Sequence, residues 1–285
     1  MIPFIILFPI FYGLIRSFTL LTKYFYSLTN NEKVWKSLSG KWVLITNVNS
    51  EFEEKICFFL AQKNVKLILL GSNENKMIEI KSKISNKVEV VYHCLDIIHQ
   101  KDFSFLEKYD IGLLINKICP FSCNPEYFME QNIDFMIDAY VKAPMNLIKT
   151  VMNYMADAHS GYIVNIGFNY SIKPSPQYSF IASIKSAYKS WSESMYYEMM
   201  SYNVNVEYME VGDMCFSDDK QFTPNIIRPS VCRTAQSVVN SLGSSYFTVP
   251  YFSHFFIYTF IFVTPRFMIG RFRNYKVFGG KDICV

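Results

Sequence analysis

Short apolar runs alternate with longer amphipathic stretches through the middle of the chain. Six runs are typical of buried strands: 41–46, 65–70, 88–93, 111–116, 161–168 and 204–211. Helical patterns separate them from Glu51 onward, at 74–85, at 128–157, and along the stripe Ile184, Tyr188, Trp191 and Met195. Continuous apolar strands that alternate with helices predict a parallel sheet covered on both faces, an α/β doubly wound fold.

The N-terminal residues 2–22 form an apolar run with one charge, Arg16. The run is long enough to cross ~30 Å of hydrocarbon as a helix, so we expect a membrane anchor. It is too long for a cleaved signal peptide, and no basic residues precede it. Lys23, Lys33 and Lys36 follow it, which predicts that the next domain faces the cytosol. A helix lying in the membrane surface is the alternative.

A second apolar stretch, 246–264, lies near the C-terminus and is almost uncharged. It could span a membrane, lie in the interface or line an acyl pocket, although Pro250 and His254 weaken the case for spanning. The sequence thus predicts three parts: an anchor (1–28), an α/β domain (39–243) and a hydrophobic, membrane-associated or acyl-pocket extension (244–285).

Composition narrows the class of partner. The chain is 51% hydrophobic and 17% aromatic, which suffices for a large core and for apolar surface facing a membrane. A net charge of +4, with no basic stripe interleaved with aromatics, gives no case for nucleic acid. Seven cysteines suit reduced thiols in a cytosol-facing domain. Cys119 and Cys123 are four residues apart, but no histidine is near, so we expect no metal site.

Several short motifs follow one another in a recognisable order. They are the entry strand "SGKWVLIT" (39–46), Asp96 in "CLDI", Asn116 at the end of "DIGLLIN", and Pro174 and Pro176 in "KPSP". In this order the chain resembles the short-chain dehydrogenase/reductase family. It is most similar to the membrane-anchored very-long-chain 3-oxoacyl-CoA reductases of the endoplasmic reticulum. The resemblance implies a Rossmann-like fold, NADP(H) as cofactor, and Asp96 near the adenine.

The resemblance also implies a catalytic set. Family members use a Tyr four residues before a Lys, a Ser thirteen residues before that Tyr, and an Asn on the preceding long helix. The Lys lowers the tyrosine pKa and holds the nicotinamide ribose, while Tyr and Ser serve the reacting oxygen. Lys185 matches the Lys here, but Ile181, Phe168 and Tyr140 occupy the other three positions. Three of the four groups are therefore absent.

Tyr178 is the nearest possible substitute for the missing proton donor. It precedes Lys185 by seven residues, which on a continuous helix puts it on roughly the same face, ~4.5 Å from the level of Ile181. Oxyanion donors need closer placement than that. We therefore favour Tyr178 as a packing or wall residue.

The turn after the first strand departs furthest from the family pattern, T-G-x-x-x-G-x-G. Thr46 is retained, but Asn47, Glu51 and Glu53 replace the glycines that admit a pyrophosphate to the helix N-terminus. Two like charges ~4 Å apart repel by about 4 kcal/mol at an effective dielectric constant of ~20. Locally, Ser50 can cap the helix with Glu53 as its capping-box partner, and the acids complement the helix dipole.

The remaining cofactor motifs are incomplete. "GSNEN" (71–75) offers neither an acid for a ribose hydroxyl nor an arginine for a 2′-phosphate. The family N-N-x-G has become Asn116–Lys117–Ile118–Cys119, and its P-G is Val211–Gly212. The residual cofactor-binding set is Thr46, Asp96, Asn116 and Lys185, so we expect no NADP(H) binding or only weak binding.

Three hypotheses follow. The first is a membrane-anchored homologue that has lost its chemistry and acts as a scaffold or lipid-pathway partner, with membrane lipid, long-chain acyl-CoA and fatty-acid elongation enzymes as partners. The second is an active NADPH-dependent 3-oxoacyl-CoA or steroid reductase with a rearranged proton donor. The third is an acyl-lipid-binding membrane protein. The resemblance and the N-terminal run place the chain in the endoplasmic reticulum membrane.

Overall fold

The computed structural model describes residues 15, 18, 19, 22, 32–100, 102–118, 126–168, 177–218, 223–243 and 245–263. Within these ranges the strands form one parallel sheet in the order β3-β2-β1-β4-β5-β6-β7. Their bounds are β1 (Trp42–Ile45), β2 (Lys66–Gly71), β3 (Val90–Cys94), β4 (Ile111–Lys117), β5 (Gly161–Phe168), β6 (Val204–Val211) and β7 (Phe247–Thr248). The predicted α/β doubly wound sheet is confirmed.

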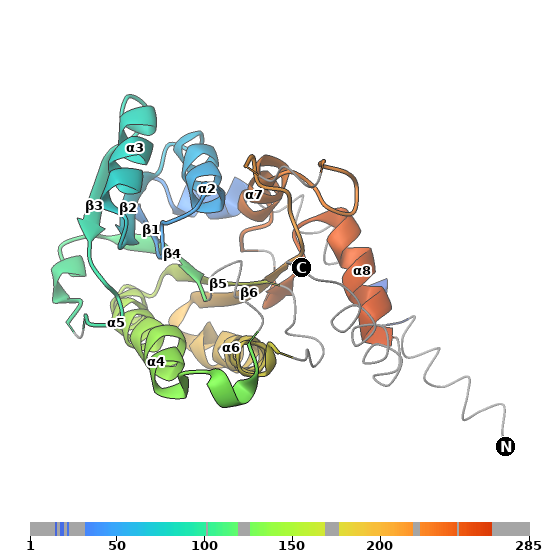
Figure 1. Cartoon of the computed structure of the whole chain (residues 1–285). Coiled ribbons are helices and arrows are strands. Elements are labelled where there is room, and N and C mark those ends of the chain that lie inside the picture. The colour runs from blue at the N-terminus through green and yellow to red at the C-terminus, as the bar shows by residue number, and fades with distance from the viewer. Residues whose placement is uncertain are drawn as a thin grey trace, which may run out of the picture.

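Helices cover both faces of this sheet (Figure 1). On one face lie α2 (Glu51–Ala61), α3 (Glu74–Ile84) and α7 (Val231–Asn240), and on the other α4 (Ile133–Ile137), α5 (Ala143–Asp157) and α6 (Ser179–Glu198). Short helical segments are η1 (Ser104–Leu106), η2 (Phe128–Glu130), η3 (Asp138–Lys142) and η4 (Met199–Tyr202). The last described helix, α8 (Phe252–Val263), lies near β7, far from β3 and α3.

Alternation of side chains along each strand divides the core into two clusters. Val43 and Ile45 point to the cluster shared with α2, α3 and α7, whereas Leu44 points to the cluster shared with α5 and α6. Strand residues are buried on both faces, as a sheet covered by helices on both sides requires. Packing in these two clusters holds the central strands in place, and the candidate site lies at the carboxyl ends of those strands.

Several predicted boundaries moved. β5 and β6 match the prediction, while β3 begins two residues later than predicted. The helical stretch predicted over roughly 128–157 is confirmed from Ile133 to Asp157, where α4, a π-helical turn η3 and α5 follow one another without a break, whereas η2 is separated from them at the extended Gln131. Pro144 accounts for the π-helical turn, because it lacks an N–H and its ring clashes with the carbonyl four residues back, at Tyr140.

The predicted membrane segments are only partly covered by the structure. Residues 2–22 fall almost entirely outside the described residues, so the predicted anchor stays a prediction. Among the residues described, we find no helix with the length and apolar character that a bilayer crossing needs. Pro174, Pro176, Cys119 and Cys123 also lie outside the described residues.

Candidate functional site

The strand order reverses between β1 and β4, and this point fixes where a ligand would bind. In doubly wound folds ligands bind outside the carboxyl ends of the strands at such a switch point. Thr46 follows β1 directly, and Asn116 lies near the end of β4. The first turn of α2 begins a few residues after Thr46, so the predicted cofactor residues and the acidic turn share one edge of the sheet.

A chain of buried polar side chains crosses the sheet beneath this edge. Thr46 Oγ1 donates to Asn116 Oδ1 at 3.0 Å, and Asn116 Nδ2 donates to Asn165 Oδ1 at 2.9 Å. Asn165 Nδ2 donates to Ser192 Oγ on α6 at 3.0 Å, while the Lys117 N–H donates to Thr46 Oγ1 at 3.1 Å. The side chains of Thr46, Asn116, Asn165 and Ser192 are all buried. They join β1, β4, β5 and α6, so this chain of hydrogen bonds stabilises the sheet; the cofactor-binding role predicted for Thr46 and Asn116 stays a prediction.

Sequence reasoning missed Asn165 and Ser192. The available signal was an amide inside the otherwise apolar strand "GYIVNIGF", because a buried amide needs partners. Which partners it finds depends on how α6 packs against β5, and periodicity does not give that.

The turn after β1 keeps a glycine-like backbone without glycine. Asn47 adopts φ 54°, in the left-handed region that asparagine tolerates better than most residues. Its Nδ2 donates to the Lys117 carbonyl at 3.0 Å, and the Val48 N–H donates to the Leu70 carbonyl at 3.0 Å. Side chain and backbone together bind this turn to β4 and β2.

Glu53 lies buried in the first turn of α2, with a carboxylate held from two sides. Its Oε1 is 2.9 Å from the Lys117 Nζ, in a pair whose side chains are 2% and 8% exposed. Its Oε2 accepts from the Ser50 N–H at 2.9 Å and from the Ser50 hydroxyl at 2.7 Å. The predicted capping box is confirmed. The ion pair with Lys117 was not predicted.

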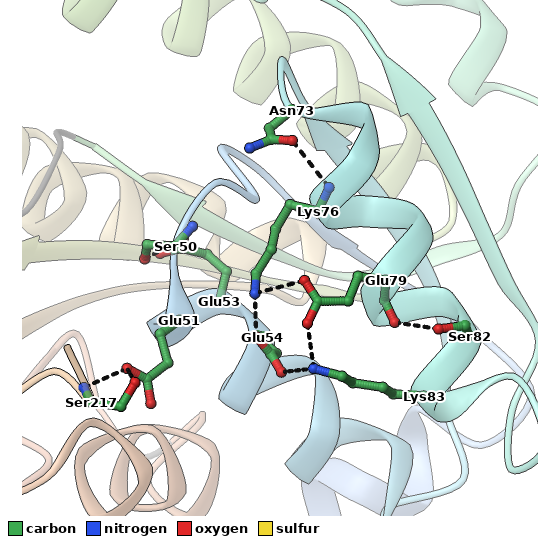
Figure 2. A network of polar contacts seen from close by, with 10 residues as sticks. All are labelled: Ser50, Glu51, Glu53, Glu54, Asn73, Lys76, Glu79, Ser82, Lys83 and Ser217. Atoms are coloured by element: carbon green, nitrogen blue, oxygen red, sulfur yellow. Dashed lines mark hydrogen bonds and ion pairs between the residues drawn. The ribbon is translucent and has the colours of Figure 1, made fainter.

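The other two acids of this turn also have partners of their own (Figure 2). Glu51 Oε2 accepts from the N–H and the hydroxyl of Ser217, which follows β6, at 2.8 and 2.9 Å. Glu54 binds Lys76 and Lys83 of α3 at 2.5 and 2.7 Å. The anions at this helix N-terminus are therefore supplied and neutralised within the chain.

Glu54, Lys76, Glu79 and Lys83 form a cluster of ion pairs, the Glu54 cluster, whose contribution to stability depends on pH. Burial raises the pKa of Glu54, but hydrogen bonds and charges from Lys76 and Lys83 outweigh it and hold this pKa below 4.5. A depressed carboxyl pKa gives stability that is present above pH 4.5 and lost as the pH falls through the folded value. Burial lowers the pKa of Lys76, but hydrogen bonds and charges from Glu54 and Glu79 outweigh burial and hold this pKa above 10.5. The stability that this raised pKa gives is fully present below pH 10.5 and is lost as the pH rises through the pKa of Lys76 in the folded protein.

Replacement of Glu54 by glutamine tests this cluster. Because the network is partly exposed, we expect Glu54→Gln to lower the free energy of unfolding by about 0.5–1 kcal/mol at neutral pH. The difference from wild type should shrink as the pH falls below 4.5 and vanish once the wild-type carboxylate is protonated. Urea unfolding at neutral pH and along an acid series measures it, with the exposed Glu193→Gln as control. A difference that stayed constant in acid would contradict the assignment to charge.

Two of the lost catalytic positions are part of the core. Phe168, at the end of β5, is 4% exposed and meets Phe52 of α2 edge to face, with ring centroids 5.7 Å apart. Ile181, in the first turns of α6, is also 4% exposed and packs in the core of the opposite face. Neither side chain carries a proton that can be transferred. The contact between Phe168 and Phe52 joins β5 to the first turn of α2 across the candidate site.

The remaining predicted catalytic residues lie on α6 and on the π-helical turn η3. Lys185 is buried on α6, and Tyr140 lies half-buried in the π-helical turn η3. Tyr178 is the N-cap of α6, with non-helical dihedrals (φ −121°, ψ 19°). The helical spacing on which its predicted alignment with Lys185 rested therefore does not apply. Its role as a substitute donor stays a prediction.

Asp96 follows β3 at the same edge of the sheet. Its side chain is exposed, and Oδ1 accepts from the Ile98 N–H at 3.0 Å, which forms a local turn. Such a position is open to a ligand, but nothing in the contacts of Asp96 selects one. In the part of the chain that the structure describes, no group of three His, Cys, Asp or Glu side chains is arranged to hold a metal.

The fold, the switch point and the retained threonine, asparagine and lysine define a dehydrogenase-like chain. The family model described as short chain dehydrogenase matches residues 41–218, so the chain belongs to the short-chain dehydrogenase family. Two curated relatives are similar to this chain over most of their length. The chain is 22% identical to the mouse (Mus musculus) very-long-chain 3-oxoacyl-CoA reductase over 249 residues, 84% of this chain and 80% of the relative. It is 23% identical to the human (Homo sapiens) inactive hydroxysteroid dehydrogenase-like protein 1 over 243 residues, 80% of this chain and 74% of the relative.

Solved structures agree on the fold. A 7beta-hydroxysteroid dehydrogenase superposes with a TM-score of 0.73 at 15% identity, covering 83% of this chain and 98% of that one. An NAD+-bound xylitol dehydrogenase gives a TM-score of 0.64 at 17% identity over 75% of this chain and 98% of the other. The architecture is thus that of the dehydrogenases, while the chemistry must be argued from the site.

Proposed function

We propose that this protein is a non-catalytic member of the short-chain dehydrogenase family that folds and acts without a dinucleotide. The observation that carries the proposal is the buried pair of Glu53 and Lys117 at the first turn of α2. In this fold class the same turn receives the pyrophosphate on its free N–H groups and positive dipole end.

The acidic turn does not fit a phosphate group. Three carboxylates already lie within one helical turn, and those of Glu51 and Glu53 accept hydrogen bonds from backbone N–H groups. Glu53 and Glu54 are paired with lysines, but Glu51 is bonded to the neutral donors of Ser217, and a pyrophosphate would meet its charge with a repulsion of about 4 kcal/mol for two unit charges ~4 Å apart. Displacing Glu53 instead would break its 2.9 Å ion pair with the buried Lys117 ammonium, which is itself costly.

The reaction centre supports the same conclusion independently. Reduction of a carbonyl by hydride needs a donor that protonates the developing alkoxide. Ile181, a core hydrocarbon, occupies the position of the family tyrosine, and Phe168, which packs on Phe52, occupies that of the family serine. Lys185 alone of the family set remains, and an ammonium that assists a tyrosine has no tyrosine at position 181 to assist.

The biological role that we propose is that of a scaffold or partner in a lipid pathway. One relative is named for 3-oxoacyl-CoA reduction and another is named inactive. The residues of this chain agree better with the second name. The apolar run 2–22 supports attachment to a membrane, and the resemblance supports the endoplasmic reticulum, with the domain facing the cytosol.

Addition of NADPH to the purified full chain tests the proposal directly. A ligand at 100 times its dissociation constant stabilises a fold by about 2.7 kcal/mol, so binding would raise the melting temperature. We expect no shift at millimolar NADPH, and no NADPH oxidation when a long-chain 3-oxoacyl-CoA is added. An active very-long-chain 3-oxoacyl-CoA reductase is the positive control. Saturable micromolar binding would overturn the first half of the proposal, and turnover would overturn all of it.

If turnover appears, Tyr178 is the residue to replace next. The second candidate function, an active reductase, is favoured only by the retained Lys185 and by a tyrosine at the N-cap of the same helix. In that case Tyr178→Phe should abolish the activity, while Tyr140→Phe should leave it intact.

A further inference from the structure

The loop that follows β6 is tied at its start to segments further along the chain. The Gly212 N–H donates to His254 Nδ1 of α8 at 3.2 Å, so the other ring nitrogen, Nε2, carries the proton and donates to the Asp213 carbonyl at 3.0 Å. The Cys215 N–H donates to the Pro229 carbonyl, just before α7, at 2.8 Å. Residues 212–215 are therefore held by contacts with α8 and with the segment that leads into α7.

Glycine at position 212 is required by this arrangement. A Cβ on Gly212 would lie 2.6 Å from Cγ of His254, so any side chain there would push the imidazole ring away. Burial lowers the pKa of His254 to about 4, so the ring is neutral at pH 7 and keeps both hydrogen bonds. The packing of His254 against the backbone thus accounts for the half of the family P-G motif that this chain retains.

Two residues further on, the same loop is held by α2. Ser217 donates twice to one carboxylate oxygen of Glu51: its N–H donates to Oε2 at 2.8 Å and its hydroxyl at 2.9 Å (Figure 2). Ser217 is exposed, and within the described residues it makes no other hydrogen bond. Glu51 is the first residue of α2 and replaces a glycine of the family pattern. Its carboxylate therefore provides a contact that glycine cannot make.

The segment between these contacts, 213–217, packs on apolar side chains at the carboxyl edge of the sheet, and we call it the strap. Met214 is buried, and the half-buried Phe216 packs against the same core cluster, which contains Phe52 and Phe168. Because Ser217 binds Glu51, the neighbour of Phe52, the strap passes beside the ring contact between Phe52 and Phe168. It thus lies against the edge of the sheet where a ligand would bind.

We propose that Glu51 and Ser217 form an autoinhibitory clasp, which keeps the strap closed against the first turn of α2 when no ligand is bound. In many enzymes such a loop closes only after the ligand has entered. Here the group that closes the loop belongs to the turn where the ligand would bind, so closure and binding exclude each other. The clasp needs an acceptor at position 51 but not its charge, which separates it from repulsion of a phosphate. The inference rests on the proposed function in taking this turn as the blocked site.

A tryptophan placed in the strap tests the clasp. Phe216→Trp is made in the full chain and combined with Glu51→Ala, which removes the acceptor, or with Glu51→Gln, whose amide oxygen still accepts from Ser217. Glu193→Ala, at an exposed position on α6, is the matched control. All these variants share the three native tryptophans as background. Unchanged far-UV circular dichroism shows that each variant folds.

We expect Glu51→Ala to raise the quenching of the added tryptophan by acrylamide roughly twofold or more, because the strap then opens locally. Glu51→Gln and Glu193→Ala should leave the quenching as it is in the Phe216→Trp chain. Equal quenching with alanine and with glutamate at position 51 would overturn the clasp. Equally increased quenching with alanine and with glutamine would overturn the claim that an uncharged acceptor is enough.

Hydrogen exchange at the amide of residue 217 provides a second measurement. We expect Glu51→Ala to speed this exchange about tenfold or more, the effect of losing one hydrogen bond to a charged group, and Glu51→Gln to change it by about threefold or less. Ser217→Ala removes only the hydroxyl and leaves α2 unchanged, so it should give an intermediate rate. If exchange at 217 rose while quenching at 216 did not, the contact would hold one residue only, and the strap would be overturned.

These measurements contain no dinucleotide, so they separate the clasp from the proposed function. If NADPH stabilised the wild-type chain, the proposed function would fail. The clasp would then stand if NADPH also speeded exchange at Ser217, since binding has to open it. It would fall if NADPH bound and left that exchange unchanged.

Discussion

Replacement of Lys117 by methionine should lower the free energy of unfolding by about 3–5 kcal/mol, the usual cost of leaving one member of a buried ion pair without its partner. Methionine keeps much of the length of the side chain and removes its charge. The Glu53 carboxylate would then remain buried with only the Ser50 donors to stabilise it. Urea unfolding at pH 7, followed by circular dichroism, measures the change.

A second substitution separates lost charge from lost packing. Glutamine at position 53 can still accept from the Ser50 N–H, because the capping box works with either Glu or Gln. Glu53→Gln combined with Lys117→Met should therefore recover most of the lost stability, with a coupling energy of about 1–3 kcal/mol between the two sites. A double variant no more stable than Lys117→Met would show that the ion pair is not what holds this turn.

Truncation of Phe168 to alanine should cost about 3–5 kcal/mol, because it opens a cavity beside Phe52 in a core that cannot fully collapse. The ring is almost completely buried and makes an edge-to-face contact with Phe52 that links β5 to α2. Chemical denaturation of the purified variant gives the value. NADPH should still fail to stabilise this variant, since the acidic turn is unchanged.

Two further variants make this result specific. Phe168→Leu keeps most of the volume and should cost less than about 1.5 kcal/mol. Phe58→Ala, on the outer side of α2, removes a ring that is 39% exposed and should cost about 1 kcal/mol or less. If Phe168→Ala were no worse than Phe58→Ala, the ring would not be a core element. Position 168 would then be free for other roles.

The order of strands and helices was predictable because its signal is local. β5 and β6 are runs of buried residues whose bounds follow from composition alone. The π-helical turn before Pro144 could also have been found, since proline has no N–H to donate to the carbonyl four residues back, at Tyr140. The short β7 could not, because two residues carry no periodicity and pair only where β6 is already in place.

The sequence was enough to predict which catalytic residues of the family are replaced in this chain, but not which residues the replacements contact. The resemblance identified Ile181 and Phe168 as substitutions, and the structure adds that both are core residues. The capping box between Ser50 and Glu53 followed from spacing alone. The partner of Glu53 on β4 did not, because Lys117 becomes its neighbour only through the pairing of β1 with β4. Long-range partners of charged groups depend on topology, which a local pattern does not contain.

The first turn of α2 connects segments that are distant along the chain: Glu51 reaches the loop after β6, Glu53 reaches β4, and Glu54 reaches α3. When a small molecule provides such connections, the folded population rises and falls with the supply of that molecule. Here the connecting groups are the side chains of Glu51, Glu53 and Glu54, which belong to the protein itself and do not depend on the supply of a small molecule. On the function proposed, the persistence of this protein in a cell should be insensitive to the nicotinamide nucleotide pool, even when that pool is depleted.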